Sequence, residues 1–189
     1  MKFTVAFLTF VLGTGLASAQ GTFVYDQQST GTVDSSVSLN QTPLGQSFTP
    51  TLNSIGFVEL QLINGVSTST FTVNLHNDSI TGPILGTTAP VAYTGSGFYD
   101  FLFSNPISLT PGTKYYFEPV VSSGGFAQTY FTFIQYTGGD LIQSGVTRSD
   151  RDLWFQEGIV SNVPEPSMLA LFIVAGGIFF WNRRKQRAT

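Results

Sequence analysis

The sequence predicts an all-β fold for residues 20–161, in the form of a single jelly-roll-like β-sandwich. Three observations lead to this prediction. Phe, Tyr, Val and Thr, which are enriched in strands, dominate the segment, and long stretches of Ala, Leu, Glu and Lys are missing. Apolar and polar residues alternate within short runs, and turn-forming clusters separate these runs. A segment of this length is one ordinary domain, and a closed barrel is the alternative arrangement of such strands.

The alternation defines the expected strands in chain order. In GFVELQLIN, one phase holds Val58, Leu60 and Leu62, and the other holds Phe57, Glu59 and Gln61. In STFTVNLH, one phase holds Phe71, Val73 and Leu75, and the other holds Thr70, Thr72, Asn74 and His76. In GFYDFLF, one phase holds Phe98, Asp100 and Leu102, and the other holds Tyr99, Phe101 and Phe103. The runs TKYYFEPVV and QTYFTFIQY continue this period of two, which indicates strands with one face on a core.

Turn residues mark the connections between these strands. The clusters are Thr81-Gly82-Pro83, Thr94-Gly95-Ser96-Gly97, Thr110-Pro111-Gly112, Ser122 to Gly125 and Thr137-Gly138-Gly139. Gly and Pro are the strongest local breaks in regular structure, so each cluster predicts a turn. Residues 27–42 are polar and low in hydrophobicity, and we expect a long loop there.

Residues 1–19 have the pattern of a secretory signal peptide. Lys2 gives a positive start, residues 3–12 are almost wholly apolar, and Ala17 and Ala19 are the small residues of a cleavage site. The apolar run is too short for an ordinary transmembrane helix. We therefore expect export through the secretion translocon and cleavage by signal peptidase after Ala19.

Residues 162–187 form a second special segment at the other end of the chain. Pro164-Glu165-Pro166 precedes an expected transmembrane helix over 167–181, and the tail 182–189 follows. The 14 uncharged residues from Met168 to Trp181 would span ~21 Å as a helix, against ~30 Å of bilayer hydrocarbon. The two prolines favour an extended backbone before this short helix.

A basic cluster orients this segment in the membrane. It consists of Arg183, Arg184, Lys185 and Arg187. Positive residues beside a membrane segment stay on the cytoplasmic side, so the domain before the helix would lie outside. This orientation agrees with the predicted signal peptide.

The domain between the two segments is acidic and lacks cysteine. Three basic residues, Lys114, Arg148 and Arg151, stand against ten carboxylates, which gives a net charge of −7. Nucleic-acid binding needs clustered Lys and Arg, so we expect no such partner. The absence of cysteine excludes disulfides, thiolate metal sites and a cysteine nucleophile.

No pattern in the domain predicts catalysis. His76 is the only histidine, and it lies on the polar phase of its strand, where we expect a solvated side chain. Glu59, Glu118 and Glu157 occur in strand-like runs, but the sequence does not pair them as a glycosidase requires. No Gly-x-Ser-x-Gly elbow is present, and a triad through His76 has no supporting pattern. We therefore expect neither enzymatic activity nor a cofactor.

Metal binding has only weak support in the sequence. Asp140, Asp150 and Asp152 supply oxygen ligands near glycine-rich turns, as Ca²⁺ prefers. The Asp-x-Asp-x-Asp-Gly loop is missing, and Arg148 and Arg151 lie among these acids. We expect an ion-paired, solvated loop here and no bound metal.

Aromatic residues offer a route to carbohydrate binding by stacking on sugar rings. The candidates are Tyr130, Phe131, Phe133, Tyr136 and Trp154, with Tyr130, Tyr136 and Trp154 the main ones. The domain holds many more Phe residues than a binding face needs, so most must lie in the core. Trp154, within DLWFQ, fits a core position better than a platform.

The C-terminal segment VPEPSMLALFIVAGGIFFWNRRKQRAT resembles the PEP-CTERM sorting signal of Gram-negative bacteria. Its Pro-Glu-Pro tripeptide, short membrane segment and Arg-rich end occur in the same order. The resemblance implies processing by an exosortase, an integral membrane cysteine protease-transpeptidase, with Pro164, Glu165 and Pro166 as recognition residues. It also implies a transient inner-membrane anchor and then a cell-surface or extracellular location, commonly in species that make exopolysaccharide and biofilm.

The middle domain resembles the "choice-of-anchor" domains that often precede such tails. The blocks LGQSFTP, FTVNLHNDSITGPILG, ISLTPGTKYYFEPVV and GGDLIQSG carry the likeness, together with DLWFQ. These domains have no settled activity, so the resemblance implies location rather than chemistry. We expect an exported surface or matrix protein, with a carbohydrate-binding module or a secreted hydrolase as alternatives and an extracellular polysaccharide as a partner.

Overall fold

The computed structural model describes residues 21–133 and 136–161, and this part of the chain is all-β, as the sequence predicts. It contains no helix, and so none long and apolar enough to cross a membrane. All strands belong to one unit, Thr22–Ser161. The predicted signal peptide, the Pro-Glu-Pro tripeptide, the predicted helix 167–181 and the basic tail lie outside the described residues.

Fourteen strands make up the described fold. The first seven are β1 (Thr22–Ser29), β2 (Ser35–Ser38), β3 (Gly45–Phe48), β4 (Ser54–Ile63), β5 (Thr70–Asn77), β6 (Ile84–Thr87) and β7 (Val91–Ala92). The others are β8 (Gly97–Ser108), β9 (Tyr115–Ser123), β10 (Gln128–Thr132), β11 (Leu141–Gln143), β12 (Val146–Arg148), β13 (Asp152–Leu153) and β14 (Phe155–Ser161). The five predicted turn clusters fall at the ends of these strands or between them.

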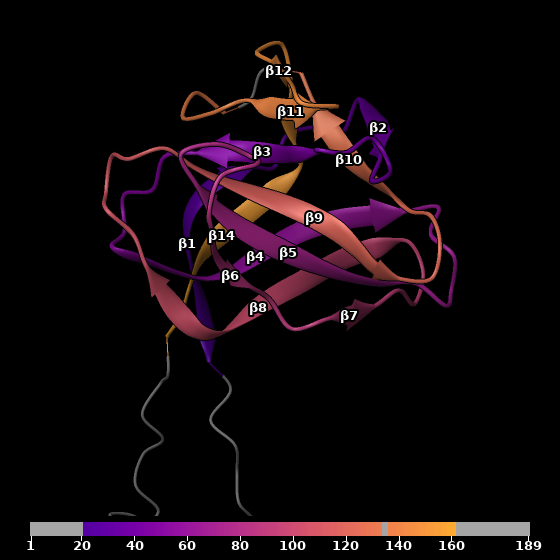
Figure 1. The fold of residues 1–189 in the computed structure, drawn as a ribbon, viewed down its shortest axis with the longest axis horizontal. Coiled ribbons are helices and arrows are strands. Elements are labelled where there is room, and N and C mark those ends of the chain that lie inside the picture. Colours follow the sequence, from indigo (N-terminus) through magenta and orange to yellow (C-terminus); the bar gives the residue numbers. More distant parts are fainter. Residues whose placement is uncertain (1–20, 134–135, 162–189) are drawn as a thin grey trace, which may run out of the picture. The chain divides into compact units, whose positions relative to one another are not determined.

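The strands form two antiparallel seven-stranded sheets, which make a β-sandwich rather than one closed barrel. Sheet A has the order β1-β14-β4-β10-β13, with β8 paired to β4 and β2 paired to β10. Sheet B has the order β12-β11-β3-β9-β5-β6, with β7 paired to β5. In Figure 1 the β11–β12 hairpin lies at one end of the sandwich, and β1 begins and β14 finishes at the other.

The core lies between the two sheets. Its largest fully buried side chains include Phe48, Phe71, Phe101, Phe117 and Phe155. Phe117 of sheet B and Phe155 of sheet A meet with ring centroids 5.2 Å apart. Full burial of one such side chain contributes about 1.5–3 kcal/mol relative to exposure. These phenylalanines therefore hold the sheets together without disulfides.

The predicted alternation is confirmed in the long strands. In β5, Phe71, Val73 and Leu75 are buried, and the residues between them are partly exposed. In β8, buried and exposed residues alternate from Phe98 to Phe103. Alternate side chains of a strand point to opposite faces of its sheet, so these patterns fix which residues face outward.

Residues 27–42 contain strand structure, so the prediction of a long loop there is wrong. β1 runs to Ser29 and β2 covers Ser35–Ser38. β1 pairs with β14, and β2 pairs with β10. Polar side chains add to this backbone pairing, as in the hydrogen bond between Ser29 and Thr132 at 3.1 Å. Tertiary pairing therefore forms strands where local hydrophobicity gives no signal.

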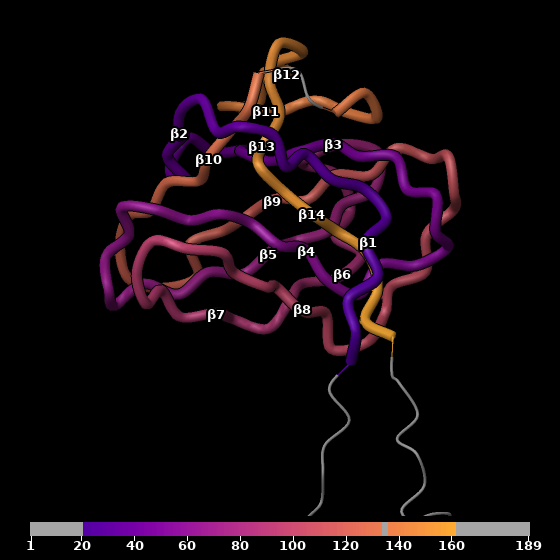
Figure 2. Tube along the Cα trace, turned by 180° about the vertical axis from the view of Figure 1, so that it is seen from behind, coloured from indigo at the N-terminus to yellow at the C-terminus, as the bar shows by residue number. Residues whose placement is uncertain are grey.

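The first and last strands lie side by side, in both Figure 1 and Figure 2. Thr22 pairs with Ser161, and the ladder continues to Ser29 and Phe155. It contains a bulge at Asp26, between Tyr25 and Gln27. Both ends of the described domain therefore meet at one edge of the same sheet.

Candidate ligand-binding face

The outer face of sheet A carries a row of polar side chains that crosses four strands. Val58, Leu60 and Leu62 of β4 point into the core, so Glu59 and Gln61 point outward. The strand register places Glu59 between Gln156 and Asp100. The whole row comprises Gln28 of β1, Gln156 of β14, Glu59 of β4 and Asp100 of β8. We call these four residues the polar strip.

The two ends of the polar strip differ in charge and in bonding. At the neutral end, Gln156 Nε2 donates a hydrogen bond of 2.9 Å to Gln28 Oε1. At the acidic end, Glu59 and Asp100 occupy directly opposite positions on β4 and β8. Side chains at such positions have Cβ atoms about 5 Å apart, so two like charges there repel each other.

The electrostatics of Glu59 and Asp100 reflect this arrangement. Burial raises the pKa of Glu59, and the neighbouring charge of Asp100 raises it further. Burial also raises the pKa of Asp100. Within residues 21–133 and 136–161, no basic side chain lies within ion-pair distance of either carboxylate. This carboxylate pair therefore has no counter-charge from the described domain.

Aromatic rings flank one side of the polar strip. Phe57 is fully buried although it points away from the core, because Phe23 and Tyr25 of β1 cover it. The ring centroids of Phe23 and Phe57 are 4.5 Å apart, and those of Tyr25 and Phe57 are 5.7 Å apart. Gly158 of β14 lies between Tyr25 and Phe57 in the register, and its lack of a Cβ lets the backbone of β1 approach closely. We call Phe23, Tyr25 and Phe57 the Phe57 group.

Tyr25 is the accessible ring of the Phe57 group. Its side chain is 48% exposed. Burial raises the pKa of its phenol, and the charges of Glu59 and Asp100 raise it further. The tyrosine ring is therefore within electrostatic reach of the carboxylate pair.

A second aromatic cluster flanks the other side of the strip. Phe98 of β8 and Trp154 pack with ring centroids 4.7 Å apart. The backbone N–H of Trp154 donates a hydrogen bond of 2.9 Å to the carbonyl of Tyr130 in β10. Phe98 is 58% exposed, whereas Trp154 is 8% exposed and lies outside the core cluster between the sheets. We call Phe98 and Trp154, together with Tyr130, whose backbone carbonyl bonds Trp154, the Trp154 group.

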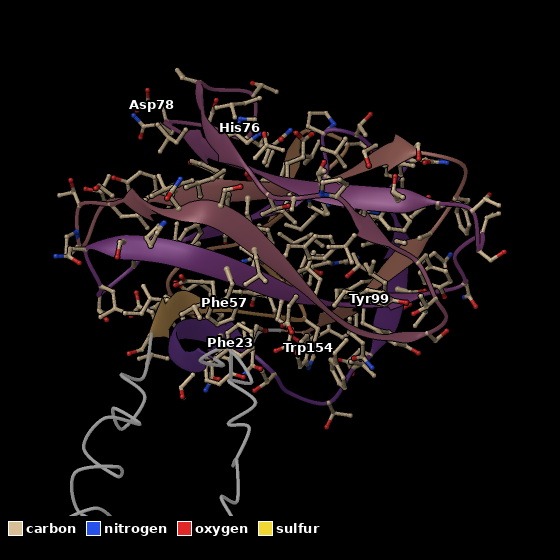
Figure 3. All side chains as sticks on the ribbon, turned by 90° about the horizontal axis from the view of Figure 1, so that it is seen from below. Phe23, Phe57, His76, Asp78, Tyr99 and Trp154 are labelled. Carbon is tan, nitrogen blue, oxygen red and sulfur yellow. The ribbon has the colours of Figure 1, made fainter. Side chains whose placement is uncertain are left out.

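The two aromatic groups lie along one extended surface. Phe57 and Gln61 are four residues apart on β4, which corresponds to about 13 Å along a strand. Gln61 pairs with Phe98, so the polar strip lies between the two groups. Figure 3 shows Phe23, Phe57 and Trp154 along one side of the sandwich, opposite His76 and Asp78. Amphipathic rings beside a few oriented polar groups are typical of a surface that binds a polar ligand with apolar faces, such as a sugar chain.

The outer face of sheet B contains His76, and the prediction that this histidine is solvated is wrong. Its side chain is 5% exposed. Nδ1 lies 3.0 Å from the carbonyl oxygen of Gly82, and Nε2 lies 3.3 Å from a carboxylate oxygen of Glu118. The turn between β5 and β6 provides Gly82, so the chain folds back over the histidine. His76 thus holds a turn in place.

The remaining aromatic candidates occupy different environments. Tyr136 faces the interior, where its ring packs against Phe155 at 5.4 Å and its hydroxyl accepts a hydrogen bond from the N–H of Thr49. Phe131 lies in the core. Phe133 is 47% exposed, with the guanidinium of Arg151 over its ring at 5.4 Å. Only Tyr130 and Trp154 of the sequence candidates belong to the outer face of sheet A.

The three aspartates considered for Ca²⁺ have different surroundings, and the backbone N–H of Asp140 donates a hydrogen bond of 2.8 Å to Ser47 Oγ. Asp152 is buried and accepts hydrogen bonds from Gln46 Nε2 at 2.8 Å and from the N–H of Tyr136 at 3.1 Å. Asp150 pairs with Arg151 at 2.7 Å on the surface. Within the described ranges, no group of three or more His, Asp or Glu residues is arranged to hold a metal ion.

A second buried carboxyl group, that of Glu157, lies between the two sheets. Glu157 of β14 is fully buried, and its Oε1 accepts a hydrogen bond of 3.1 Å from the N–H of Gln27. Its Oε2 has no hydrogen-bond partner. Burial raises the pKa of Glu157 to about 8, with a further contribution from Asp26. Glu157 is therefore protonated at neutral pH.

Asp26 retains its charge next to Glu157. Burial acts to raise its pKa, but hydrogen bonds from Leu52 and Thr51 outweigh burial and lower it. The N–H groups of Thr51 and Leu52 donate at 2.8 and 2.9 Å. The bulge in β1 thus places a charged carboxylate where it caps the connection between β3 and β4.

Sequence reasoning alone did not identify the main residues of this face. Tyr25, Phe98 and Asp100 had no assigned role, and Glu59 was one of three unpaired glutamates. The alternation of GFVELQL and GFYDFLF assigned Glu59 and Asp100 to one of the two phases of each strand, without showing which phase faces the core. The missing information was the register that brings them together.

The comparisons with known proteins add no assignment. No family model matches the chain, and a search of curated proteins finds no similar sequence.

Proposed function

We propose that this chain is an exported bacterial surface or matrix protein whose β-sandwich binds an extracellular polysaccharide through the outer face of sheet A. The observation that supports binding is the polar strip between the Phe57 and Trp154 groups. Exposed rings such as Tyr25 and Phe98 can stack on the apolar faces of sugar rings. The amides of the strip can donate hydrogen bonds to sugar hydroxyl groups and accept them, and its carboxylates can accept them.

The arrangement of strands supports a jelly-roll-like architecture for this module. Successive strands change sheets repeatedly: β3, β5, β9 and β11 belong to sheet B, and β4, β8, β10 and β14 belong to sheet A. Such crossing between two packed sheets is how jelly rolls connect their strands.

Binding and export are tested separately. For binding, the full chain is purified in detergent, and its retention on the exopolysaccharide of the producing bacterium is measured. Tyr25→Ala combined with Phe98→Ala should weaken retention by about tenfold or more, because aromatic anchors at binding faces each contribute about 1–2 kcal/mol. Tyr116→Ala, at a partly exposed position of β9 that pairs with His76 of sheet B, is the aromatic control. Equal retention of the double variant and the control would refute the proposed face.

Export and sorting form the second part of the proposal. The signal-peptide pattern of residues 1–19 and the order Pro-Glu-Pro, short apolar segment and basic cluster in 162–187 support it. Exosortase would read Pro164, Glu165 and Pro166 and remove the temporary inner-membrane anchor. A Pro164→Ala plus Glu165→Ala variant should accumulate uncleaved in membranes, and mass spectrometry of the mature C-terminus reports the cleavage. Normal release of that variant would contradict this part.

Glycoside hydrolysis is the second candidate function, and the Glu59–Asp100 pair is the observation that favours it. Two carboxyl groups can act as acid and nucleophile or base when their separation is suitable. Such catalysis needs environments that push the two pKa values apart, whereas here both are raised by burial on an open sheet face. We therefore favour binding without turnover. Release of reducing ends from a bound polysaccharide, lost in Glu59→Gln, would establish the hydrolase instead.

A further inference from the structure

We propose that the polysaccharide bound by the outer face of sheet A carries free amino groups, with an ammonium group seated at the Glu59–Asp100 pair. This inference rests on the proposed function and specifies its ligand. It identifies a polymer of amino sugars as the occupant of the face.

The first argument is the lack of a counter-charge. Glu59 and Asp100 face each other across β4 and β8, where like charges destabilise a sheet. Elsewhere in the described residues, Asp150 pairs with Arg151, and Glu118 contacts His76. A ligand ammonium group would donate charge-assisted hydrogen bonds to Glu59 and Asp100 and supply the missing counter-charge.

The second argument is the position of the aromatic rings. Tyr25 packs against Phe57 with ring centroids 5.7 Å apart, and Phe57 lies two positions before Glu59 on the same face of β4. On the same β8 face, Phe98 lies two positions before Asp100 and is 58% exposed. Cations are attracted to the faces of aromatic rings, and partial burial of the site strengthens the attraction. The rings therefore favour the same ligand charge as the carboxylates.

The third argument is the charge of the domain as a whole. Its net charge of −7 repels polymers of uronic acids or sulfated sugars. A neutral polymer would leave the carboxylates uncompensated while the rings stack. The amides of Gln28 and Gln156 extend the strip with neutral donors and acceptors, which suit the hydroxyl groups next to each amine. Charge complementarity therefore selects the amino polymer.

The test compares three oligosaccharides of equal length with the full chain in detergent: glucosamine oligomers, N-acetylglucosamine oligomers and glucuronate oligomers. Binding is measured by calorimetry at a pH where the free amine is protonated. The glucosamine oligomer should bind about tenfold more tightly than its N-acetylated counterpart, which corresponds to about 1.4 kcal/mol. The glucuronate oligomer should bind most weakly, and added salt should reduce the preference for glucosamine.

Two variants test whether Glu59 and Asp100 produce the preference for glucosamine. Glu59→Gln combined with Asp100→Asn should abolish the preference for glucosamine while binding of the N-acetylated oligomer remains. Asp78→Asn removes a carboxylate from an exposed turn, at a φ of 66° that asparagine tolerates, and should leave the preference unchanged. Retention of the preference in the double variant would overturn the inference.

Two further outcomes separate this inference from the proposed function. Equal binding of the glucosamine and N-acetylated oligomers, still lost in Tyr25→Ala plus Phe98→Ala, refutes the amino ligand but supports a sugar-binding face. A preference for glucosamine that appears only when Ca²⁺ is added also refutes the direct ammonium contact. If no polysaccharide is retained, the proposed function fails together with the inference.

Discussion

On the outer face of sheet B, Glu118 contacts His76, whereas on the outer face of sheet A, Glu59 faces Asp100. Both faces arise from the same alternation of inward and outward residues. Sheet B also contains a hydrogen bond of 2.8 Å from Thr87 to Asn74 on this face. Sheet A instead exposes two aromatic rings and a carboxylate pair without a counter-charge. A face that satisfies its own polar groups contributes to stability, and a face that leaves them unsatisfied is suited to a ligand.

The largest effect is expected from the carboxyl group that lies between these faces. The folded state holds a proton on Glu157 up to a pH of about 8, whereas an unfolded glutamate releases it near 4.5. The folded state therefore binds more protons, so the free energy of unfolding should fall as the pH rises from about 4.5 to 8. Because of this difference in proton binding, the free energy of unfolding should fall by on the order of a few kcal/mol over this pH range.

Replacement of this carboxyl group tests the assignment. Glu157→Gln should remove most of the pH dependence and raise the melting temperature at alkaline pH, as measured by circular dichroism across a pH series. Asp78→Asn is the control and should retain the slope of the unmodified protein. If the melting temperatures of Glu157→Gln and the unmodified protein depend on pH in the same way, Glu157 is not the residue that holds the buried proton.

The next effect concerns the stabilising role of sheet B. His76→Ala leaves Glu118 and the carbonyl of Gly82 without their buried partner, so the free energy of unfolding should fall by about 1–3 kcal/mol. Gln61→Ala, on the outer face of sheet A, should change it by less than about 0.5 kcal/mol. Urea denaturation measures both. A loss for Gln61→Ala as large as that for His76→Ala would remove the distinction between the faces.

The smallest expected effect on the free energy of unfolding comes from the removal of one charge from each face. Glu118→Gln should lower the free energy of unfolding by about 1 kcal/mol, because it weakens the contact with His76. Asp100→Asn should raise it by about 0.2–1 kcal/mol, because it relieves the repulsion with Glu59. The gain for Asp100→Asn should shrink at high salt, where the repulsion is screened. Opposite signs for the two variants support the comparison, and equal signs contradict it.

Much of the fold could be predicted from the sequence, because strand periodicity is a local property. The phases of β5 and β8 followed directly from apolar alternation at Phe71, Val73 and Leu75 and at Tyr99, Phe101 and Phe103. β1 and β2 were missed because their polar residues form strands only when β14 and β10 pair with them. His76 was misplaced because burial by a turn depends on the path of the chain beyond the strand.

The candidate face was harder to predict for the same reason. Gln28, Glu59, Asp100 and Gln156 are far apart in the sequence, and only the register of four strands aligns them. Tyr130 and Trp154 were considered for stacking on composition alone. Their shared face could not be recognised without the pairing of β10 and β13.

The β1–β14 edge connects the binding face with the expected sorting of the protein. β1 supplies Tyr25 and Gln28, and β14 supplies Gln156. The two strands also contain the ends of the described domain, at Thr22 and Ser161. In the proposed pathway, both processing events would occur close in sequence to strands that carry residues of the proposed binding face.

An NMR titration of the isotope-labelled protein with glucosamine oligomers tests the central claim most directly. We expect the backbone amides of Tyr25, Glu59 and Asp100 and the indole N–H of Trp154 to shift, while those of His76 and Glu118 on sheet B stay unchanged. Shifts confined to the outer face of sheet B, with sheet A unaffected, would contradict the account.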